Sequence, residues 1–138
     1  YLMGVCLGMQ LLFDSSDEFG NNKGLGLVQG TVERFPSVIN DKKIRVPHIG
    51  WNNIQKTSKE NNWNSSPLAN ISEQDYLYFI HSYYAKPANL NNILSISQYQ
   101  EFEFCSSVQK DNVFGFQFHP EKSAEQGLSI YKNFLKYT

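Results

Sequence analysis

A short glycine-flanked segment near the start of the chain constrains the fold most strongly. The residues Gly4-Val5-Cys6-Leu7-Gly8 place a cysteine between two glycines, at the end of the apolar run Tyr1-Leu2-Met3-Gly4-Val5. Glycines two positions on either side of a central residue let a strand turn sharply into a helix, and the turn exposes the central side chain. We therefore predict a buried strand over 1–5, a helix over 7–13 and an exposed nucleophile at Cys6.

The neighbours of Cys6 fit a nucleophile. The N-terminus of a helix and its free N–H groups favour the thiolate and lower the pKa of a cysteine, and the N–H of Leu7 can donate to an oxyanion. Gln10 follows Cys6 by four residues, so on a helix its amide lies on the same face and can hold a bound substrate. A buried structural cysteine is the alternative interpretation, since free cysteine is among the most buried residue types.

A second segment, much later in the chain, supplies a base. The strand-like run Val113–Phe118 ends in His119-Pro120-Glu121. Proline biases the preceding residue toward extended backbone, in which side chains two residues apart project to the same side. The Glu121 carboxylate can therefore accept the Nδ1–H of His119, which leaves Nε2 free to face a thiol. Together the two segments predict a cysteine nucleophile with a base and an orienting carboxylate.

The two segments resemble those of the class I glutamine amidotransferases, whose glutaminase domains carry Gly-x-Cys-x-Gly-x-Gln and a downstream His-Pro-Glu. Within that family, three stretches are similar to the glutaminase subunit of imidazole glycerol phosphate synthase, which serves histidine biosynthesis. These stretches are Lys43–Asn52, Tyr78–Tyr84 and His119–Ser123. The Pro47-His48-Ile49-Gly50-Trp51-Asn52 part is the most specific to this subfamily, and the resemblance runs from Tyr1 to the C-terminal helix.

The resemblance implies an enzyme that hydrolyses glutamine to glutamate and ammonia through a triad of Cys6, His119 and Glu121, with no cofactor. It implies that groups beside the nucleophile bind the glutamine, and these residues are Leu7, Gln10, Ser82 and Tyr83. It also implies a heterodimer with a cyclase subunit, which uses the ammonia to make imidazole glycerol phosphate and aminoimidazole carboxamide ribotide.

A partner surface is implied by the same resemblance. Trp51 and Lys122 are expected to face the cyclase subunit, and Tyr78 is assigned to the same surface. From the residues alone, Trp51 can equally be an ordinary half-buried aromatic and Lys122 a solvated charge. His48 and His81, each beside a strand-like run, are typical of hydrogen-bonded structural histidines.

The remaining pattern predicts an α/β fold. The apolar run Tyr76–Ile80 is typical of a buried strand in a covered sheet. Shorter strands are predicted over 31–35 and 42–46. Three β-like runs separated by short polar turns predict an antiparallel meander, over 93–99, 104–109 and 113–118, and a helix follows Ser123.

The architecture that the resemblance implies is a flavodoxin-like three-layer sandwich, with helices on both faces of the sheet and an antiparallel extension near the C-terminus. Residues 1–138 are expected to form one glutaminase domain that lacks its N-terminal part. In the family, that part supplies the first strands and a glycine-rich loop with a second oxyanion donor, and neither is present in this sequence.

Composition argues against several other functions. A net charge of −1 argues against a basic surface that could bind nucleic acid. No stretch is apolar and long enough to cross a membrane and no leader pattern opens the chain, so we expect a cytoplasmic protein. The three histidines lack ligand spacing and no Cys-x-x-Cys is present, which argues against a metal site. Cys105 lies in a strand-like run and is predicted to be a buried thiol.

Three alternative functions stay open. The glutaminase of another amidotransferase, such as the one serving pyridoxal phosphate synthase, would share the triad but lack the stretch from Pro47 to Asn52. A peptidase or γ-glutamyl hydrolase would need an open cleft for a larger substrate. A non-catalytic interaction protein of the same fold would have no need of an intact nucleophile, base, orienting carboxylate and glutamine.

Overall fold

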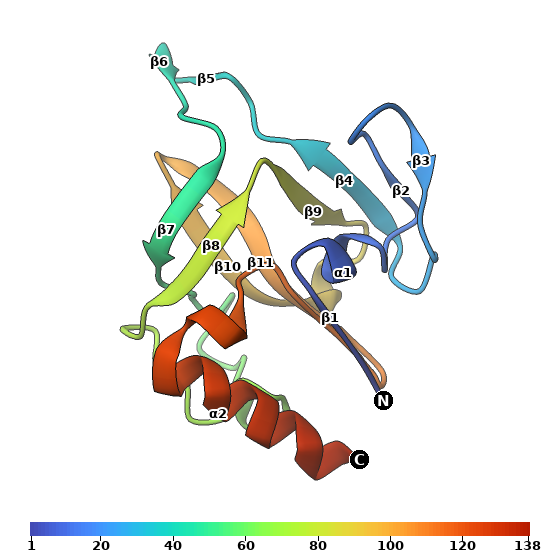
Figure 1. The fold of residues 1–138 in the computed structure, drawn as a ribbon, viewed down its shortest axis with the longest axis vertical. Helices are drawn as coiled ribbons and strands as arrows, with labels where there is room; N and C mark the ends of the chain where they lie inside the picture. Colours follow the sequence, from blue (N-terminus) through green and yellow to red (C-terminus); the bar gives the residue numbers. More distant parts are fainter.

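The chain folds around a curled, mixed β-sheet (Figure 1). The computed structural model describes residues 1–138. The strands of the central sheet follow the order β1-β12-β11-β9-β4-β2-β3, and β10 also pairs with β11. Their bounds are β1 (Leu2–Val5), β2 (Ser15–Ser16), β3 (Asn22–Lys23), β4 (Gly30–Arg34), β9 (Tyr83–Pro87), β10 (Ile93–Tyr99), β11 (Phe102–Lys110) and β12 (Val113–Phe116). Only the β1–β12 and β2–β4 pairs are parallel.

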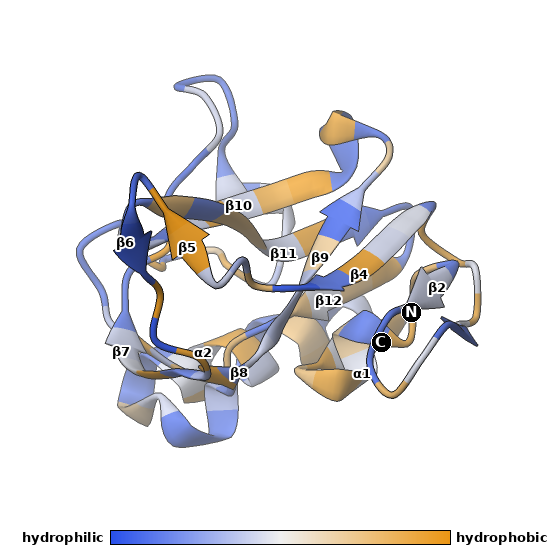
Figure 2. Ribbon diagram, turned by 90° about the horizontal axis from the view of Figure 1, so that it is seen from above, coloured by the Kyte–Doolittle hydropathy of each residue, from blue (hydrophilic) through white to orange (hydrophobic).

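Two short antiparallel ribbons stand outside that sheet. They are β5 (Val38–Ile39) with β6 (Lys42–Lys43), and β7 (His48–Asn52) with β8 (Leu77–His81). Figure 2 shows the first ribbon as a hydrophobic strand beside a hydrophilic one. The α-helices are α1 (Leu7–Gln10) and α2 (Ala124–Phe134), and single 3₁₀ turns are η1 (Trp63–Ser65), η2 (Leu90–Asn92), η3 (Pro120–Lys122) and η4 (Leu135–Tyr137). None of the helices combines the length and the apolar character that crossing a membrane requires.

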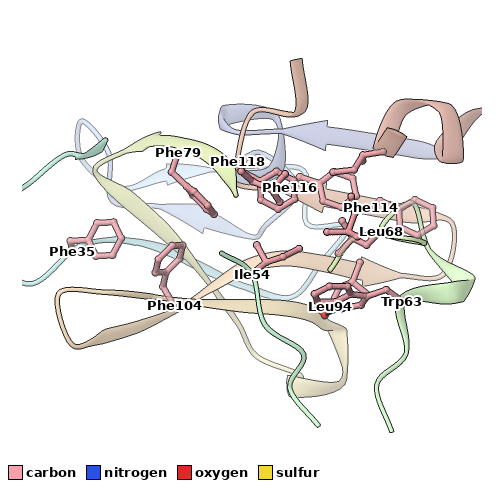
Figure 3. Close-up of a cluster of buried hydrophobic side chains, with 13 residues drawn as sticks. Phe35, Ile54, Trp63, Leu68, Phe79, Leu94, Phe104, Phe114, Phe116 and Phe118 are labelled. Atoms are coloured by element: carbon pink, nitrogen blue, oxygen red, sulfur yellow. Dashed lines mark hydrogen bonds between the residues drawn. The ribbon is translucent and has the colours of Figure 1, made fainter. Parts of the chain in front are cut away.

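Strand β12 shows how the sheet separates two cores. Because side chains alternate along a strand, Phe114 and Phe116 project to one face, into the large cluster shown in Figure 3, which also contains Ile130 of α2. Gly115 faces the other side, where an added Cβ would lie 2.8 Å from the Met9 Cγ of α1. One helix therefore covers each face, and the predicted α/β class with helices on both faces is confirmed.

Strand β11 contains a bulge at Ser106. Cys105 lies opposite Ile96 of β10, but Ser107 lies opposite Ser95, so Ser106 is the extra residue. The hydroxyl of Ser95 is 2.8 Å from that of Ser106 and 2.5 Å from that of Ser107, and all three serines are buried. The bulge shifts the alternation of side chains by one residue between the two halves of the strand.

The predicted antiparallel meander is confirmed, because β10, β11 and β12 pair antiparallel in sequence order. Its first turn places Gln100 and Glu101 at φ of 47° and 66°, as a tight hairpin with two residues of positive φ requires. The strand predicted over 31–35 forms as β4, and the one predicted over 42–46 forms only as the two residues of β6.

Helix α1 is shorter than the predicted 7–13 and ends at Gln10. The segment Gly24–Val28 lies against its end, and three of its N–H groups donate to the carbonyls of residues 11–13 at 2.8, 2.9 and 3.1 Å. These carbonyls would otherwise need other partners beyond the helix end. The glycine-rich segment therefore satisfies the carbonyls beyond the helix end. The two segments are distant in sequence, so local sequence patterns do not predict this contact.

Two strands that were predicted to be buried lie at the margins of the fold. β1 is the edge of the central sheet, with Tyr1 62% and Leu2 42% exposed. Most of the run 76–80 lies in β8, which begins at Leu77 and pairs only with β7, and the side chains of β8 alternate between the core and the surface. The prediction of a fully covered strand is wrong here, because exposed Tyr76 and Ile80 give an apolar run without burial on both faces.

Candidate active site

Cys6 occupies the corner between β1 and α1. Its backbone has φ of 52° and ψ of −110°, a conformation that is uncommon for a residue other than glycine. The N–H of Cys6 donates to the Phe116 carbonyl at 2.7 Å, which anchors the corner to β12. A Cβ on Gly4 would lie 2.5 Å from the Gly8 carbonyl oxygen, whereas a Cβ on Gly8 would meet open space. Close packing therefore requires the first glycine of the motif, and the backbone strain falls on the cysteine itself.

The expected lowering of the Cys6 pKa is wrong for this structure. Burial raises the pKa of the thiol, the N–H of Leu7 opposes this, and the carboxylates of Glu121 and Glu18 raise it further, so that the net shift is upward. A hydrogen bond from Gln117 lowers the pKa again, without reversing the shift. A helix of four residues also supplies only a small dipole, since the macrodipole is a sum over aligned peptide units.

The predicted base and its orienting carboxylate are paired. His119 Nδ1 lies 2.5 Å from Glu121 Oε1, and the hydroxyl of Tyr131 donates to Glu121 Oε2 at 3.2 Å. Burial raises the pKa of Glu121, but the hydrogen bond from His119, that from the backbone N–H of Glu121 itself, the electrostatic interaction with His119 and the hydrogen bond from Tyr131 together outweigh it, and the net shift is downward. An ionised Glu121 accepts from Nδ1–H, so Nε2 carries the free lone pair of His119. That nitrogen is buried and has no hydrogen-bond partner.

Cys6 and His119 both contact strand β8 but are not hydrogen bonded to each other. The Cys6 thiol donates to the Ile80 carbonyl, with a distance of 3.8 Å between sulfur and oxygen. The N–H of His119 donates to the Tyr78 carbonyl at 2.8 Å. Ser123 Oγ supports the same contact, because it donates to the His119 carbonyl and accepts from the N–H of Tyr78. The end of β8 thus links the nucleophile with the base.

A pocket of about 170 Å³ opens beside the nucleophile. It contains Cys6 and all of the residues that were predicted to bind the substrate. Its lining consists of Cys6, Leu7, Gln10, Glu18, Ile80, His81, Ser82 and Tyr83. A larger pocket of about 560 Å³ lies elsewhere, against η1 and η2, and includes none of these residues. The smaller pocket is therefore the candidate substrate site.

Both side-chain N–H groups of Gln10 donate hydrogen bonds within the protein. Its Nε2 donates to the Tyr83 carbonyl at 3.2 Å and to Gln117 Oε1 at 3.1 Å. An amide nitrogen has two hydrogens, so only the Gln10 carbonyl oxygen is left to interact with a ligand. Gln10 can therefore accept a hydrogen bond in the pocket but cannot donate one.

His48 and His81 form a buried pair, and His81 is also part of the pocket lining. His81 Nδ1 lies 2.7 Å from the Tyr83 carbonyl, so it carries the hydrogen, and its Nε2 accepts from His48 Nδ1 at 3.0 Å. Burial lowers the pKa of His48 to about 4 and that of His81 to about 3, so both rings are neutral near pH 7. The interpretation of these residues as hydrogen-bonded structural histidines is confirmed.

The three residues predicted to face a partner lie together on the outer face of the β7–β8 ribbon. Trp51 pairs directly with Tyr78, their ring centroids are 5.8 Å apart, and Lys122 Nζ lies 5.8 Å from the Tyr78 ring. Ile49 and Ile80 form the neighbouring pair on the same face, and with Trp51 they are among the exposed large hydrophobic residues. The five residues form one exposed surface, which we call the ribbon face.

Two residues at the site were not anticipated from the sequence. Gln117 is fully buried and donates to Cys6 Sγ at 3.7 Å, and Tyr131 holds the second oxygen of Glu121. The signal for Gln117 was present: it precedes His119 by two residues, and residues two apart project to the same side of an extended chain. Tyr131 lies on a separate helix, and no local spacing connects it to the site.

No group of three histidine, cysteine, aspartate or glutamate side chains lies close enough together to hold a metal ion. The glycine-rich segment Gly24–Gly30 uses several of its N–H groups on the carbonyls after α1 and on Asp14.

Comparison with known proteins gives matches over nearly the whole chain. Residues 2–137 match the family described as glutamine amidotransferase class-I. The chain is 47% identical over 135 residues to the imidazole glycerol phosphate synthase subunit HisH of Geobacillus thermodenitrificans, covering 97% of this chain and 60% of that protein. It is 44% identical over 137 residues to the protein of the same name from Sulfurimonas denitrificans, covering 99% and 62%. The chain thus spans about three fifths of the length of these curated relatives.

Solved structures show the same fold at low identity. A putative GMP synthase protein from Thermoplasma acidophilum superposes with a TM-score of 0.62 at 16% identity, over 97% of this chain and 55% of that one. A glutamine amidotransferase superposes with a TM-score of 0.61 at 17% identity, over 98% and 59%. At such identities the likeness concerns the fold alone.

Proposed function

Because the chain belongs to the class I glutamine amidotransferase family, we propose that the whole protein hydrolyses glutamine to glutamate and ammonia. The observation that supports this most is the state of His119. Its Nδ1 is held by Glu121, and its buried Nε2 has no partner. Buried nitrogens of structural histidines are normally hydrogen bonded, whereas a general base needs a free lone pair. No cofactor enters the proposal.

In the first half of the reaction, Cys6 Sγ attacks the side-chain amide carbon of glutamine. A sulfur–carbon bond forms, the carbonyl electron pair moves onto oxygen, and the thiol proton passes to His119 Nε2. The N–H of Leu7 donates to the oxyanion. His119 then gives its proton to the nitrogen, the carbon–nitrogen bond breaks, and ammonia leaves a thioester on Cys6.

In the second half, water hydrolyses the thioester. His119 Nε2 takes a proton from the water as its oxygen attacks the thioester carbon, and the oxyanion forms again. The carbon–sulfur bond breaks, the proton returns to sulfur, and glutamate leaves. Glu121 keeps the proton of His119 on Nδ1 throughout and stabilises the imidazolium that forms in each half.

The pocket supplies groups for the rest of the glutamine molecule. The free Gln10 carbonyl oxygen is suited to the α-amino group, because it can only accept. Backbone groups near Ser82 and Tyr83 line the same pocket and would contact the α-carboxylate or the amino group. Nearby Glu18 has no basic partner within salt-bridge distance, and as an anion it favours an ammonium group over a second carboxylate.

A glutamine analogue that carries a diazoketone in place of the amide tests this proposal. Attack by the nucleophile alkylates it irreversibly, so the protein should gain the mass of the analogue less dinitrogen on the peptide that holds Cys6. The peptide that holds Cys105 is the internal control and should stay unmodified. Absence of the adduct, together with absence of glutamate release from glutamine, would rule the glutaminase function out.

We further propose that the ammonia is passed to a cyclase subunit, as in imidazole glycerol phosphate synthase. The name of the relatives at 47% and 44% identity supports this assignment. The heterodimer would make imidazole glycerol phosphate and aminoimidazole carboxamide ribotide for histidine biosynthesis. Direct transfer matters because ammonia released into water is protonated near neutral pH and loses its nucleophilic electron pair. A cytoplasmic location stays a prediction.

The ribbon face is the proposed docking surface for that subunit. It joins the exposed Trp51 to Tyr78 and Lys122, and Lys122 directly follows the orienting carboxylate Glu121. Ile80, on the same face, accepts the hydrogen bond of the Cys6 thiol through its carbonyl. A partner seated there would therefore lie within a few residues of both the nucleophile and the base.

Calorimetry with the cyclase subunit tests the surface. Trp51→Ala should weaken association about thirtyfold, since loss of an interface tryptophan typically costs roughly 2 kcal/mol or more. Glutamine-dependent synthesis should fall, while synthesis from free ammonia continues. Leu90→Ala removes a comparably exposed apolar side chain far along the chain and should change neither quantity. Normal binding and full glutamine-dependent turnover in Trp51→Ala and Lys122→Ala would mean that the partner docks elsewhere.

A further inference from the structure

Gln117 is a buried polar side chain that the mechanism above does not use. It follows β12 directly and is fully buried. Its N–H donates to the Ser106 carbonyl at 2.9 Å, so the bulge of β11 fixes its backbone. Burying an amide is costly unless its polar atoms are bonded, and this amide finds its partners at the active site.

The orientation of the Gln117 amide follows from its neighbours. Both hydrogens of Gln10 Nε2 point at oxygen atoms, the Tyr83 carbonyl and Gln117 Oε1. The oxygen of the Gln117 amide must therefore face Gln10, and its nitrogen faces Cys6 Sγ at 3.7 Å. A reversed amide would set two NH₂ groups against each other and leave the sulfur without this donor.

We propose that Gln117 is a further catalytic residue, whose side-chain amide donates a hydrogen bond to Cys6 Sγ and stabilises the thiolate that forms when the thiol proton leaves for His119. The consequence for turnover rests on the proposed glutaminase function, but the contact itself does not. Gln10 acts through Gln117, as a positioning residue that keeps the amide of Gln117 turned toward the sulfur.

The surroundings of Cys6 make such a donor important. Burial raises the pKa of the thiol, and the carboxylates of Glu121 and Glu18 raise it further. The imidazole of His81 lines the pocket but is neutral, and His119 is paired through its Nδ1 with Glu121. The opposing groups that touch the sulfur are the N–H of Leu7 and the amide of Gln117. Removing the Gln117 amide would leave the N–H of Leu7 as the other donor to a half-buried thiolate.

The test is the alkylation rate of Cys6 by iodoacetamide as a function of pH, measured on the full-length protein by mass spectrometry of the peptide that holds Cys6. Gln117→Met keeps the length of the side chain and removes the donor. It should move the midpoint of the profile upward by about one pH unit and slow alkylation about tenfold below the midpoint, the size expected for loss of a hydrogen bond to a charged group. Gln117→Asn keeps an amide but withdraws it from the sulfur, and should shift the midpoint in the same direction.

Gln109→Met is the matched control, because Gln109 lies on β11 and lines the larger pocket away from Cys6. Its profile should coincide with that of the unaltered protein. Gln117→Asn provides the measurement if Gln117→Met does not fold, as judged by circular dichroism. Unchanged midpoints in folded Gln117 variants would overturn the proposal.

Alkylation needs no glutamine, so the two proposals fail separately. A shifted midpoint in a protein that releases no glutamate from glutamine would retain the Gln117 contact and remove the glutaminase function. Glutamate release by the unaltered protein, with no shift in the variants, would retain the function and remove the role of Gln117.

Discussion

The corner that carries Cys6 and the bulge beside Cys105 belong to the same sheet, yet they place a thiol in opposite settings. Both thiols have pKa values raised by burial, that of Cys105 to about 12. Cys105 donates to the Ser107 carbonyl at 3.3 Å within its own strand and is 6% exposed. Cys6 lines a pocket, and two donors point at its sulfur. Desolvation is common to both, so the proposed nucleophile is distinguished by access and by the groups around it.

Exchanging each cysteine for alanine gives the largest expected contrast. Cys6→Ala removes the covalent path and should lower kcat for glutamine hydrolysis on the order of 10⁶-fold, by analogy with loss of a triad nucleophile. Cys105→Ala should keep nearly full activity and lose about 1 kcal/mol of stability through the missing buried sulfur. The measurements are steady-state glutamate release and thermal unfolding. If Cys6→Ala kept the turnover of the unaltered protein, Cys6 would not be the nucleophile.

The second contrast concerns the base, which only the Cys6 corner has. Glu121→Gln should lower kcat on the order of 10⁴-fold and leave a measurable remnant, because the nucleophile remains while His119 loses the acceptor that fixes its tautomer. Glu125→Gln, on the exposed first turn of α2, is the control and should have no effect on kcat. Equal losses in Cys6→Ala and Glu121→Gln would instead make the carboxylate indispensable rather than supporting.

The smallest contrast is chemical and needs no variant. With a pKa of about 12, Cys105 is thiolate in only about one part in 10⁴ at pH 8, and its sulfur is also covered. Alkylation at pH 8 should therefore be confined to Cys6 of the two, and its rate should rise with pH because the thiolate is the reactive form. Peptide mapping after iodoacetamide treatment measures both sites. Comparable labelling of Cys105 would show that access does not separate the two thiols.

Local patterns predicted the parts of the molecule that are locally determined. The meander over β10, β11 and β12 was predicted because alternation and polar turns act within a few residues of each other. The pairing of His119 with Glu121 was predicted from their spacing of two residues, and it forms although Glu121 lies in the 3₁₀ turn η3 and not on the extended backbone that the prediction assumed. The corner at Cys6 follows from the glycine before it, which has no room for a side chain.

The predictions that were wrong concern features that depend on contacts between distant segments. The position at which α1 ends depends on the loop at Gly24–Val28. The partial exposure of β8 depends on its pairing with β7 outside the central sheet. The pKa of Cys6 was misjudged because burial raises it most, and the carboxylates of Glu121 and Glu18 raise it further from other elements. Gln117 could have been found by extending the period-two rule backward from His119, but its partner Gln10 could not.

Because β11 contains one extra residue, the correct placement of its side chains depends more on the number of residues in the strand than on their identity. The bulge inverts the phase of the pleat between Cys105 and Val108, so that both face the core beside α1. Exchanging a side chain there disturbs one contact. Deleting one residue would turn every side chain beyond the cut to the opposite face, and Gln117 would lose the carbonyl that holds its backbone. We expect this strand to tolerate substitutions better than insertions or deletions, although none of its residues lines the pocket at Cys6.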